Sequence, residues 1–276
     1  MTTIWDIDAA DERLSLFTSL TNHQLRNALD PKMGVVIVES EIAIRVALSE
    51  GLEPLAFLLS KRRLQSMEDV LSNLDDEVPV YVLTAQESEK ICGYAVTRGA
   101  LAAMRRPQVL DLAELLGRCR RLVVLEGITD TANVGAIFRN AAALGADGVI
   151  CAPTCADPLT RRSVRVSMGN VFKLPWLRLS GAWPQPFIED LKEAGFERLA
   201  LALVEGACDV SDPRLKDLDR VALFFGSEGY GLSREVVEAC DHKVIIPMMG
   251  GVDSLNVAAS TAVALWELFD RGVQHS

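Results

Sequence analysis

Hydrophobic and polar residues alternate along the first hundred residues in a pattern that predicts strands separated by helices. Three short apolar runs have the length and composition of buried strands. They lie at 34–38 (GVVIV), 55–59 (LAFLL) and 78–83 (VPVYVL). Stretches with helical spacing follow these runs, at about 40–51, 61–74 and 85–94. The pattern therefore predicts a compact α/β domain.

The second half of the chain repeats this rhythm with longer apolar runs. The strand candidates are 121–127, 147–153, 198–204, 221–226 and 243–248. Strands that are apolar throughout, with helices between them, favour a parallel sheet covered on both faces. The segment 98–121, which holds Pro107 and many charges, is interpreted as the crossing between two domains. We expect an α/β domain with its linker at 1–108 and a second domain at 109–276.

Composition narrows the class of protein. The chain has 276 residues, 49% of them hydrophobic, which is enough for well-formed cores. Its six cysteines form no CxxC pair and only three histidines accompany them, so we expect reduced thiols and no metal site. The apolar runs are too short to span a membrane, and the acidic start differs from a signal peptide, which predicts a cytoplasmic protein with no membrane partner.

The formal net charge of −10 argues against indiscriminate binding to polyanions. Any nucleic-acid site must then be local, and basic residues do cluster in four places. The clusters are 61–63, then Arg98 with Arg105 and Arg106, then Arg118 with Arg120 and Arg121, and finally Arg161 with Arg162 and Arg165. Each cluster is either an ordinary solvated face or a set of RNA phosphate contacts.

Candidate chemistry gathers after three of the predicted strands, where ligands of parallel sheets bind. The first strand of the second half is followed by a helix that Asp130 or Thr131 would cap. The glycine-rich stretch GSEGYGLS starts at 226, and IPMMGGVDSLNVAAS spans 246–260. Plain alternatives exist: the glycines could be turn residues, Ser254 a helix cap, and Arg139 a partner of a surface carboxylate. No GxGxxG fingerprint, phosphate-binding GxxxxGK[ST] or GxSxG elbow is present.

Four segments together resemble the SpoU/TrmH branch of the SPOUT methyltransferases. They are NVGAIFRNAAALGADGVI, SVRVSMGNVFKLP, FFGSEGYGLS and IPMMGGVDSLNVAAS. The first domain resembles the family's RNA-binding N-terminal domain more loosely, through 26–59 and TRGALAAMRRP. The resemblance implies methyl transfer from S-adenosylmethionine to a ribose 2'-hydroxyl of tRNA or rRNA. It also implies a deep trefoil knot in a parallel-sheet domain and a homodimer formed through that domain.

The resemblance assigns residues to three roles, without a metal. The expected catalytic residues are Asn133, Arg139, Glu228, Ser254 and Asn256. The expected cofactor-binding residues are Phe225, Gly226, Ile246, Met248 and Leu255. RNA binding is expected of Arg98, Arg161, Arg162 and Arg165.

The role of Arg139 has two versions. A guanidinium with a pKa above about 12 is a reluctant base, so Arg139 acts either as a base helped by an RNA phosphate or as a cation that stabilises the alkoxide. In the second version, Glu228 or the phosphate takes the proton.

Two other functions remain open from the sequence. A non-catalytic RNA-binding or ribosome-assembly protein could keep this fold without turnover. A small-molecule transferase with the same cofactor would suit the acidic charge. The sequence does not decide between tRNA and rRNA.

Overall fold

The computed structural model describes residues 2–4, 7, 11–21, 30–108, 110–249 and 254–269. Contacts divide the chain into two compact units, 1–108 with 159–173, and 109–158 with 174–276. The sequence-based boundary places 159–173 in the second domain, whereas the contacts of this segment group it with the first unit. None of the helices in the described ranges has the length and apolar content needed to cross a bilayer.

The first unit contains a five-stranded mixed sheet in the order β1-β4-β3-β5-β2. Its strands are β1 (Thr2–Ile4), β2 (Val35–Glu39), β3 (Pro54–Leu59), β4 (Pro79–Val82) and β5 (Ala100–Arg105). Its helices are η1 (Glu12–Phe17), α2 (Glu41–Ser49), α3 (Lys61–Ser66), α4 (Glu68–Leu71), α5 (Ala85–Cys92), α8 (Arg161–Val166) and η2 (Asn170–Phe172). The predicted α/β alternation is confirmed for this unit.

Side-chain caps fix where the helices of the first unit begin. Ser40 accepts a hydrogen bond from the backbone N–H of Ala43 at the start of α2. Thr84 and Glu87 form a reciprocal capping box at the start of α5. The single helix predicted over 61–74 is wrong, because the backbone leaves the helical conformation at Met67, between α3 and α4, and the residue is fully buried.

The segment 98–121, predicted as the crossing between two domains, contains a strand and a helix. It contains β5, which pairs antiparallel with both β2 and β3, so five of its six residues are buried. The alanine-rich run ALAAM has weak intrinsic strand preference, and pairing on both sides overrides it. The segment also holds α6 (Leu112–Arg118), which belongs to the second unit.

The second unit contains a seven-stranded sheet in the order β10-β12-β9-β11-β6-β7-β8, in which every pairing is parallel. Its strands are β6 (Arg121–Leu125), β7 (Gly148–Cys151), β8 (Trp176–Arg178), β9 (Glu197–Leu201), β10 (Cys208–Asp209), β11 (Val221–Phe225) and β12 (His242–Ile245). Besides α6, its helices are α7 (Thr131–Ala143), α9 (Phe187–Glu193), α10 (Pro213–Lys216), α11 (Arg234–Ala239) and α12 (Val257–Leu268). The parallel sheet predicted from the apolar runs is confirmed.

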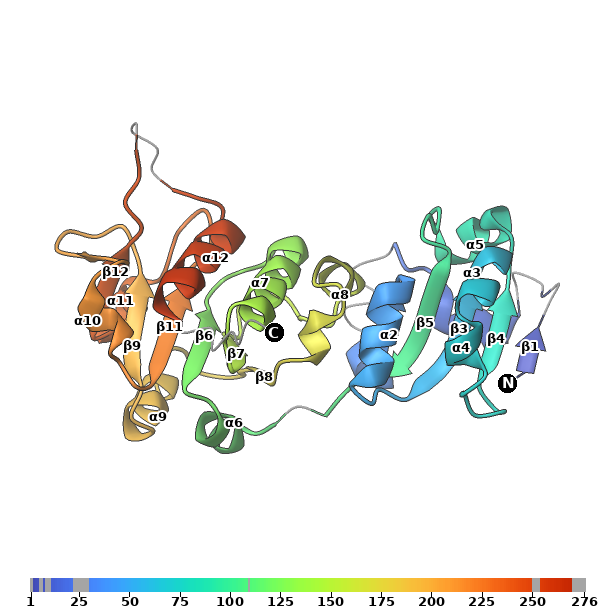
Figure 1. The fold of residues 1–276 in the computed structure, drawn as a ribbon, viewed down its shortest axis with the longest axis horizontal. Helices are drawn as coiled ribbons and strands as arrows, with labels where there is room; N and C mark the ends of the chain where they lie inside the picture. Colours follow the sequence, from blue (N-terminus) through green and yellow to red (C-terminus); the bar gives the residue numbers. More distant parts are fainter. Residues whose placement is uncertain are drawn as a thin grey trace, which may run out of the picture. The chain divides into compact units, whose positions relative to one another are not determined.

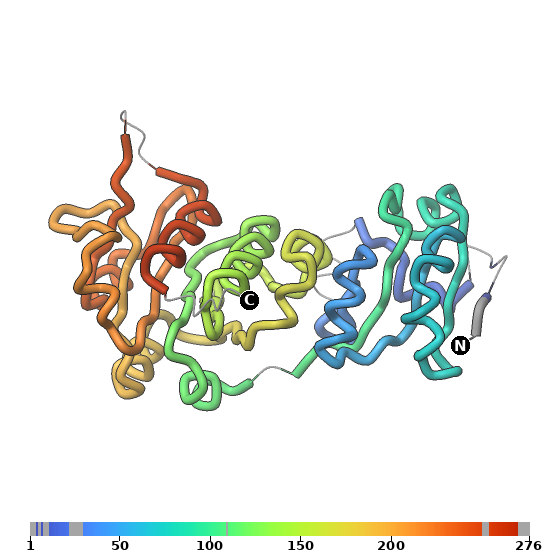
Figure 2. Tube along the Cα trace, viewed as in Figure 1, coloured from blue at the N-terminus to red at the C-terminus, as the bar shows by residue number. Residues whose placement is uncertain are grey.

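Helices cover this sheet on both faces. On one face, α6, α9 and α11 pack against alternate strand residues such as Leu122 and Phe224 in a single hydrophobic cluster. On the other face lie α7 and α12, which pack against each other side by side (Figure 1). Figure 2 traces α12 along α7, and the amide of Asn140 on α7 donates to the carbonyl of Ala258 on α12 at 2.7 Å. This contact places the first turn of α12 beside the last turns of α7.

Candidate active site

A pocket opens at the carboxyl ends of β9, β11 and β12 in the second unit. Its volume is about 430 Å³, within the usual range for a nucleoside-sized ligand. All five predicted cofactor-binding residues line it: Phe225, Gly226, Ile246, Met248 and Leu255. The predicted catalytic residues Glu228 and Ser254 also line it. The rule that parallel sheets bind ligands beyond their strand ends therefore located the pocket.

Three predicted catalytic side chains meet at this edge in a closed hydrogen-bonded triangle. The amide of Asn133, on the first turn of α7, donates to Oε1 of Glu228 at 3.0 Å. The amide of Asn256 donates to the same Glu228 oxygen and, at 3.1 Å, to Oδ1 of Asn133. The triangle joins α7, the loop after β11 and the start of α12.

The start of α12 is capped by Asn256, whose side-chain oxygen accepts from the backbone N–H groups of Ala258 and Ala259. The alternative that Ser254 is this helix cap is therefore wrong. Leu255, between Ser254 and Asn256, is 39% exposed. Residues 250–253, which precede Ser254, lie outside the described residues.

The loop after β11 closes on itself. Ser227 and Gly231 exchange two backbone hydrogen bonds, of 3.2 and 2.8 Å. A Cβ added at Gly226 would lie 2.0 Å from the carbonyl carbon of Gly231, which is far inside van der Waals contact. Glycine at 226 is thus needed for the loop to close.

Arg139 lies exposed on α7, two turns after Asn133. Across the described part of the chain, no hydrogen bond or ion pair involves its guanidinium, so the alternative of a surface carboxylate partner has no support. An arginine held on a rigid helix without a carboxylate partner can offer all its donors to a ligand.

Sequence reasoning missed Glu126, which directly follows β6 and is buried. Its carboxylate accepts from the backbone N–H and hydroxyl of Ser233 at 2.7 and 2.8 Å, and from the indole N–H of Trp183 at 2.6 Å. Ser233 caps α11, so Glu126 fixes the far end of the glycine loop. The signal was a lone carboxylate ending a buried apolar strand.

The predicted RNA-binding residues behave differently from one another. Arg161 and Arg165 form ion pairs with Glu39 at 2.5 and 3.4 Å, and Glu39 is only 1% exposed. The Tyr94 hydroxyl donates to the same carboxylate at 3.2 Å, and the Arg161 guanidinium lies 4.2 Å from the Tyr94 ring centre. Burial of Tyr94 raises the pKa of its hydroxyl well above the usual range. Arg162 on the same helix is exposed.

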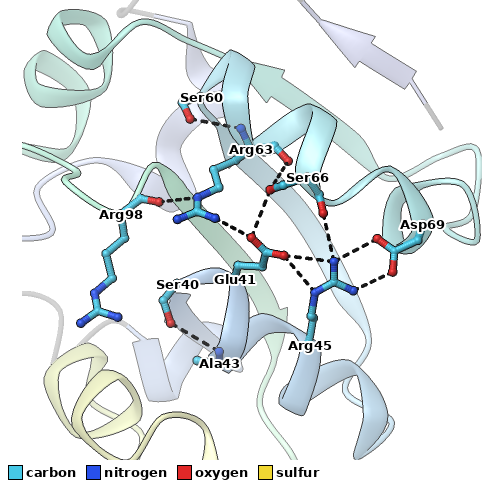
Figure 3. Close-up of polar contacts among 9 residues, drawn as sticks. All are labelled: Ser40, Glu41, Ala43, Arg45, Ser60, Arg63, Ser66, Asp69 and Arg98. Carbon is cyan, nitrogen blue, oxygen red and sulfur yellow. Dashed lines mark hydrogen bonds and ion pairs between the residues drawn. The ribbon is translucent and has the colours of Figure 1, made fainter.

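A second network in the first unit surrounds Glu41 (Figure 3). Its carboxylate accepts from Arg45 at 3.1 Å and from Arg63 at 2.5 Å, and Arg45 also pairs with Asp69 at 2.7 Å. Arg63 donates in addition to the backbone carbonyl of Arg98, while the Arg98 side chain points away from the network (Figure 3). The Arg98 side chain is therefore exposed, while its backbone carbonyl is held by Arg63.

The chain is similar in sequence to a known family and to curated proteins. Residues 120–266 match the SpoU rRNA Methylase family model. The chain is 38% identical to an uncharacterized tRNA/rRNA methyltransferase of Mycobacterium bovis, over 94% of this chain and 89% of that protein.

Two solved structures have a fold similar to that of this chain. The SpoU methyltransferase AviRb from Streptomyces viridochromogenes, in complex with the cofactor AdoMet, superposes with a TM-score of 0.77 at 26% identity, covering 94% of this chain and 97% of that one. An RNA 2'-O ribose methyltransferase structure gives 0.78 at 25% identity, covering 97% and 98%.

A parallel-sheet domain with a pocket and a polar triangle at its strand ends defines the class as an α/β protein with a ligand site beyond its strands. The chain belongs to the SpoU rRNA methylase family and is a methyltransferase. The resemblance stated from four short segments is thereby confirmed.

Proposed function

We propose that this protein transfers a methyl group from S-adenosylmethionine to a ribose 2'-hydroxyl of tRNA or rRNA. The observation that carries the proposal is the Asn133–Glu228–Asn256 triangle at the edge of the pocket after β11 and β12. The names of the relatives support RNA as the substrate, and one structural neighbour is described as a 2'-O ribose methyltransferase. These names do not favour the non-catalytic alternative.

The pocket suits S-adenosylmethionine. Phe225, Ile246 and Leu255 supply apolar walls for an adenine, and the glycine loop presents backbone groups next to them. The AviRb structure carries the same cofactor. When bound, the cofactor supplies an electrophilic methyl group whose C–S bond breaks as the new C–O bond forms.

The chain's own residues orient the acceptor and handle its proton. Oε1 of Glu228 receives both asparagine amides, which leaves Oε2 to accept the proton of the ribose hydroxyl. Arg139 acts as the orienting cation that stabilises the developing alkoxide, because its charge has no carboxylate partner to offset it. Ser254, exposed at the pocket rim, contacts the ribose or its phosphate.

Assembly and location belong to the same proposal. Val263 and Trp266, three positions apart on α12, are exposed apolar side chains, and they support a homodimer through the second unit. A deep trefoil knot in the second unit and a cytoplasmic location complete the proposal.

The test is calorimetric titration with S-adenosylmethionine, followed by transfer of tritiated methyl to tRNA and to rRNA. The proposal expects saturable binding and label in one RNA class. Absence of binding at millimolar cofactor would contradict it.

Gly226→Ala is the matched negative control. Because its Cβ would collide with the Gly231 backbone, we expect cofactor affinity to fall by about tenfold or more. Gly229→Ala, in the same loop with nothing within 4 Å of the added Cβ, should bind like the wild type.

A further inference from the structure

Tyr230 is an aromatic residue exposed to solvent beside the pocket. Its side chain is 97% exposed, although burying an aromatic ring is normally favourable. It nevertheless lines the pocket, where the other aromatic wall residue among those described, Phe225, is buried. Tyr230 is thus the ring at this site that remains available to a ligand arriving from outside.

The backbone under Tyr230 is held in place. The Ser227–Gly231 bridge closes the loop, and the N–H of Tyr230 donates to the hydroxyl of Ser227 at 3.3 Å. Two residues earlier, Glu228 is fixed by both asparagines of the triangle. The ring is therefore presented from a preorganised loop that also carries the proposed proton acceptor.

The proposed chemistry decides what reaches this ring. A ribose whose 2'-hydroxyl enters the triangle carries its base on the adjacent carbon, so the base must come to the mouth of the same pocket. Leu203 and Val204, which are exposed and line the same pocket, make this mouth apolar. Stacking on aromatic side chains is the common way in which proteins hold unpaired RNA bases.

We propose that Tyr230 is a nucleobase-stacking residue that binds the base of the target nucleotide or its neighbour, and that the target is therefore an unpaired nucleotide. This inference rests on the proposed function, and it adds a substrate-recognition residue and the structural class of the acceptor.

Kinetics of Tyr230→Ala and Tyr230→Phe on unmodified tRNA and rRNA transcripts test it. For Tyr230→Ala we expect the KM for RNA to rise by about 5- to 100-fold, the range for loss of one stacked base. Tyr230→Phe keeps the ring and should keep the wild-type KM. The Kd for S-adenosylmethionine should stay within about twofold of wild type in both variants, because the ring binds substrate only.

Controls separate the outcomes. Met33→Ala removes an exposed apolar side chain of the first unit and should leave the KM unchanged. An unchanged RNA KM in Tyr230→Ala, or a loss confined to cofactor affinity, would overturn the stacking role while leaving the proposed function intact. Equal methylation of a transcript and of the same transcript annealed to its complement would overturn the unpaired target. Absence of methyl transfer by the wild-type protein would overturn the proposed function and this inference with it.

Discussion

Two groups of arginines differ in what their guanidinium groups contact: those around Glu39 and Glu41 in the first unit, and Arg139 on α7 of the second. In the first group, Arg45, Arg63, Arg161 and Arg165 are all paired with carboxylates, chiefly Glu41 and Glu39. Arg139 has no such partner in the described ranges, although other arginines of the second unit, such as Arg198, are paired. We propose that the paired arginines hold the fold together and that Arg139 binds the substrate.

The same contrast bears on how an acidic protein could bind RNA locally. Pairing with carboxylates offsets much of the positive charge of the basic clusters, whereas Arg98, Arg139 and Arg162 have no carboxylate partner among the residues that the structure describes. Three substitutions separate these roles.

Arg139→Ala should have the largest effect. Removing a cation that stabilises the developing alkoxide should lower kcat by about 100- to 1,000-fold, as the loss of one transition-state donor does. Cofactor Kd, measured by calorimetry, should change by no more than about twofold because Arg139 lies outside the pocket wall. Equal loss of cofactor binding and turnover would contradict this role.

Glu39→Gln should chiefly destabilise the fold. It leaves Arg161 and Arg165 without a charged partner beside a buried site, so we expect a loss of about 2–3 kcal/mol in unfolding free energy. The loss falls below that for a fully buried pair because Arg165 is 37% exposed. Urea denaturation measures it, with Glu53→Gln, whose ion pair to Arg105 is exposed, as the near-neutral control. A Glu39→Gln variant as stable as the wild type would show that the pairing is incidental.

The double variant Arg98→Ala with Arg162→Ala should have the smallest effect. If both contact RNA phosphates, the slope of log affinity against log salt should fall in magnitude by between about 1.4 and 1.8. Filter binding between low and moderate salt measures the slope. An unchanged slope would remove both residues from the RNA interface. Arg161→Ala serves as the contrast, since its pairing with Glu39 predicts a change in stability with little change in slope.

Local pattern predicted much of the fold and of the site. Long apolar runs identified five of the seven parallel strands of the second unit, and their ends located the pocket without any long-range information. The two short edge-side strands β8 and β10, of three and two residues, were not predicted because neither forms an apolar run. Strand β5 was not predicted, because its alanines favour a helix. It is extended because it pairs with the neighbouring strands β2 and β3. The break at Met67 was also not predicted, because the residues from 61 to 74 have helical spacing throughout and Met67 is buried only in the folded structure.

Pairing between distant residues could not be predicted. Glu39 and Arg161 are 122 positions apart, and nothing near either residue indicates the other. The same holds for Glu126 and Ser233, which are 107 positions apart. A basic cluster in sequence therefore gives the number of arginines but not their free charge.

Identification of the methylated nucleoside would distinguish ribose methylation from base methylation. RNA labelled by the wild-type protein would be digested to nucleosides and analysed by mass spectrometry, with Arg139→Ala as the control reaction. We expect a 2'-O-methyl nucleoside in the wild-type reaction, with its amount sharply reduced in the control. A methyl group on a base, or equal yields from both proteins, would contradict the assignment of Arg139 and the triangle to ribose methylation.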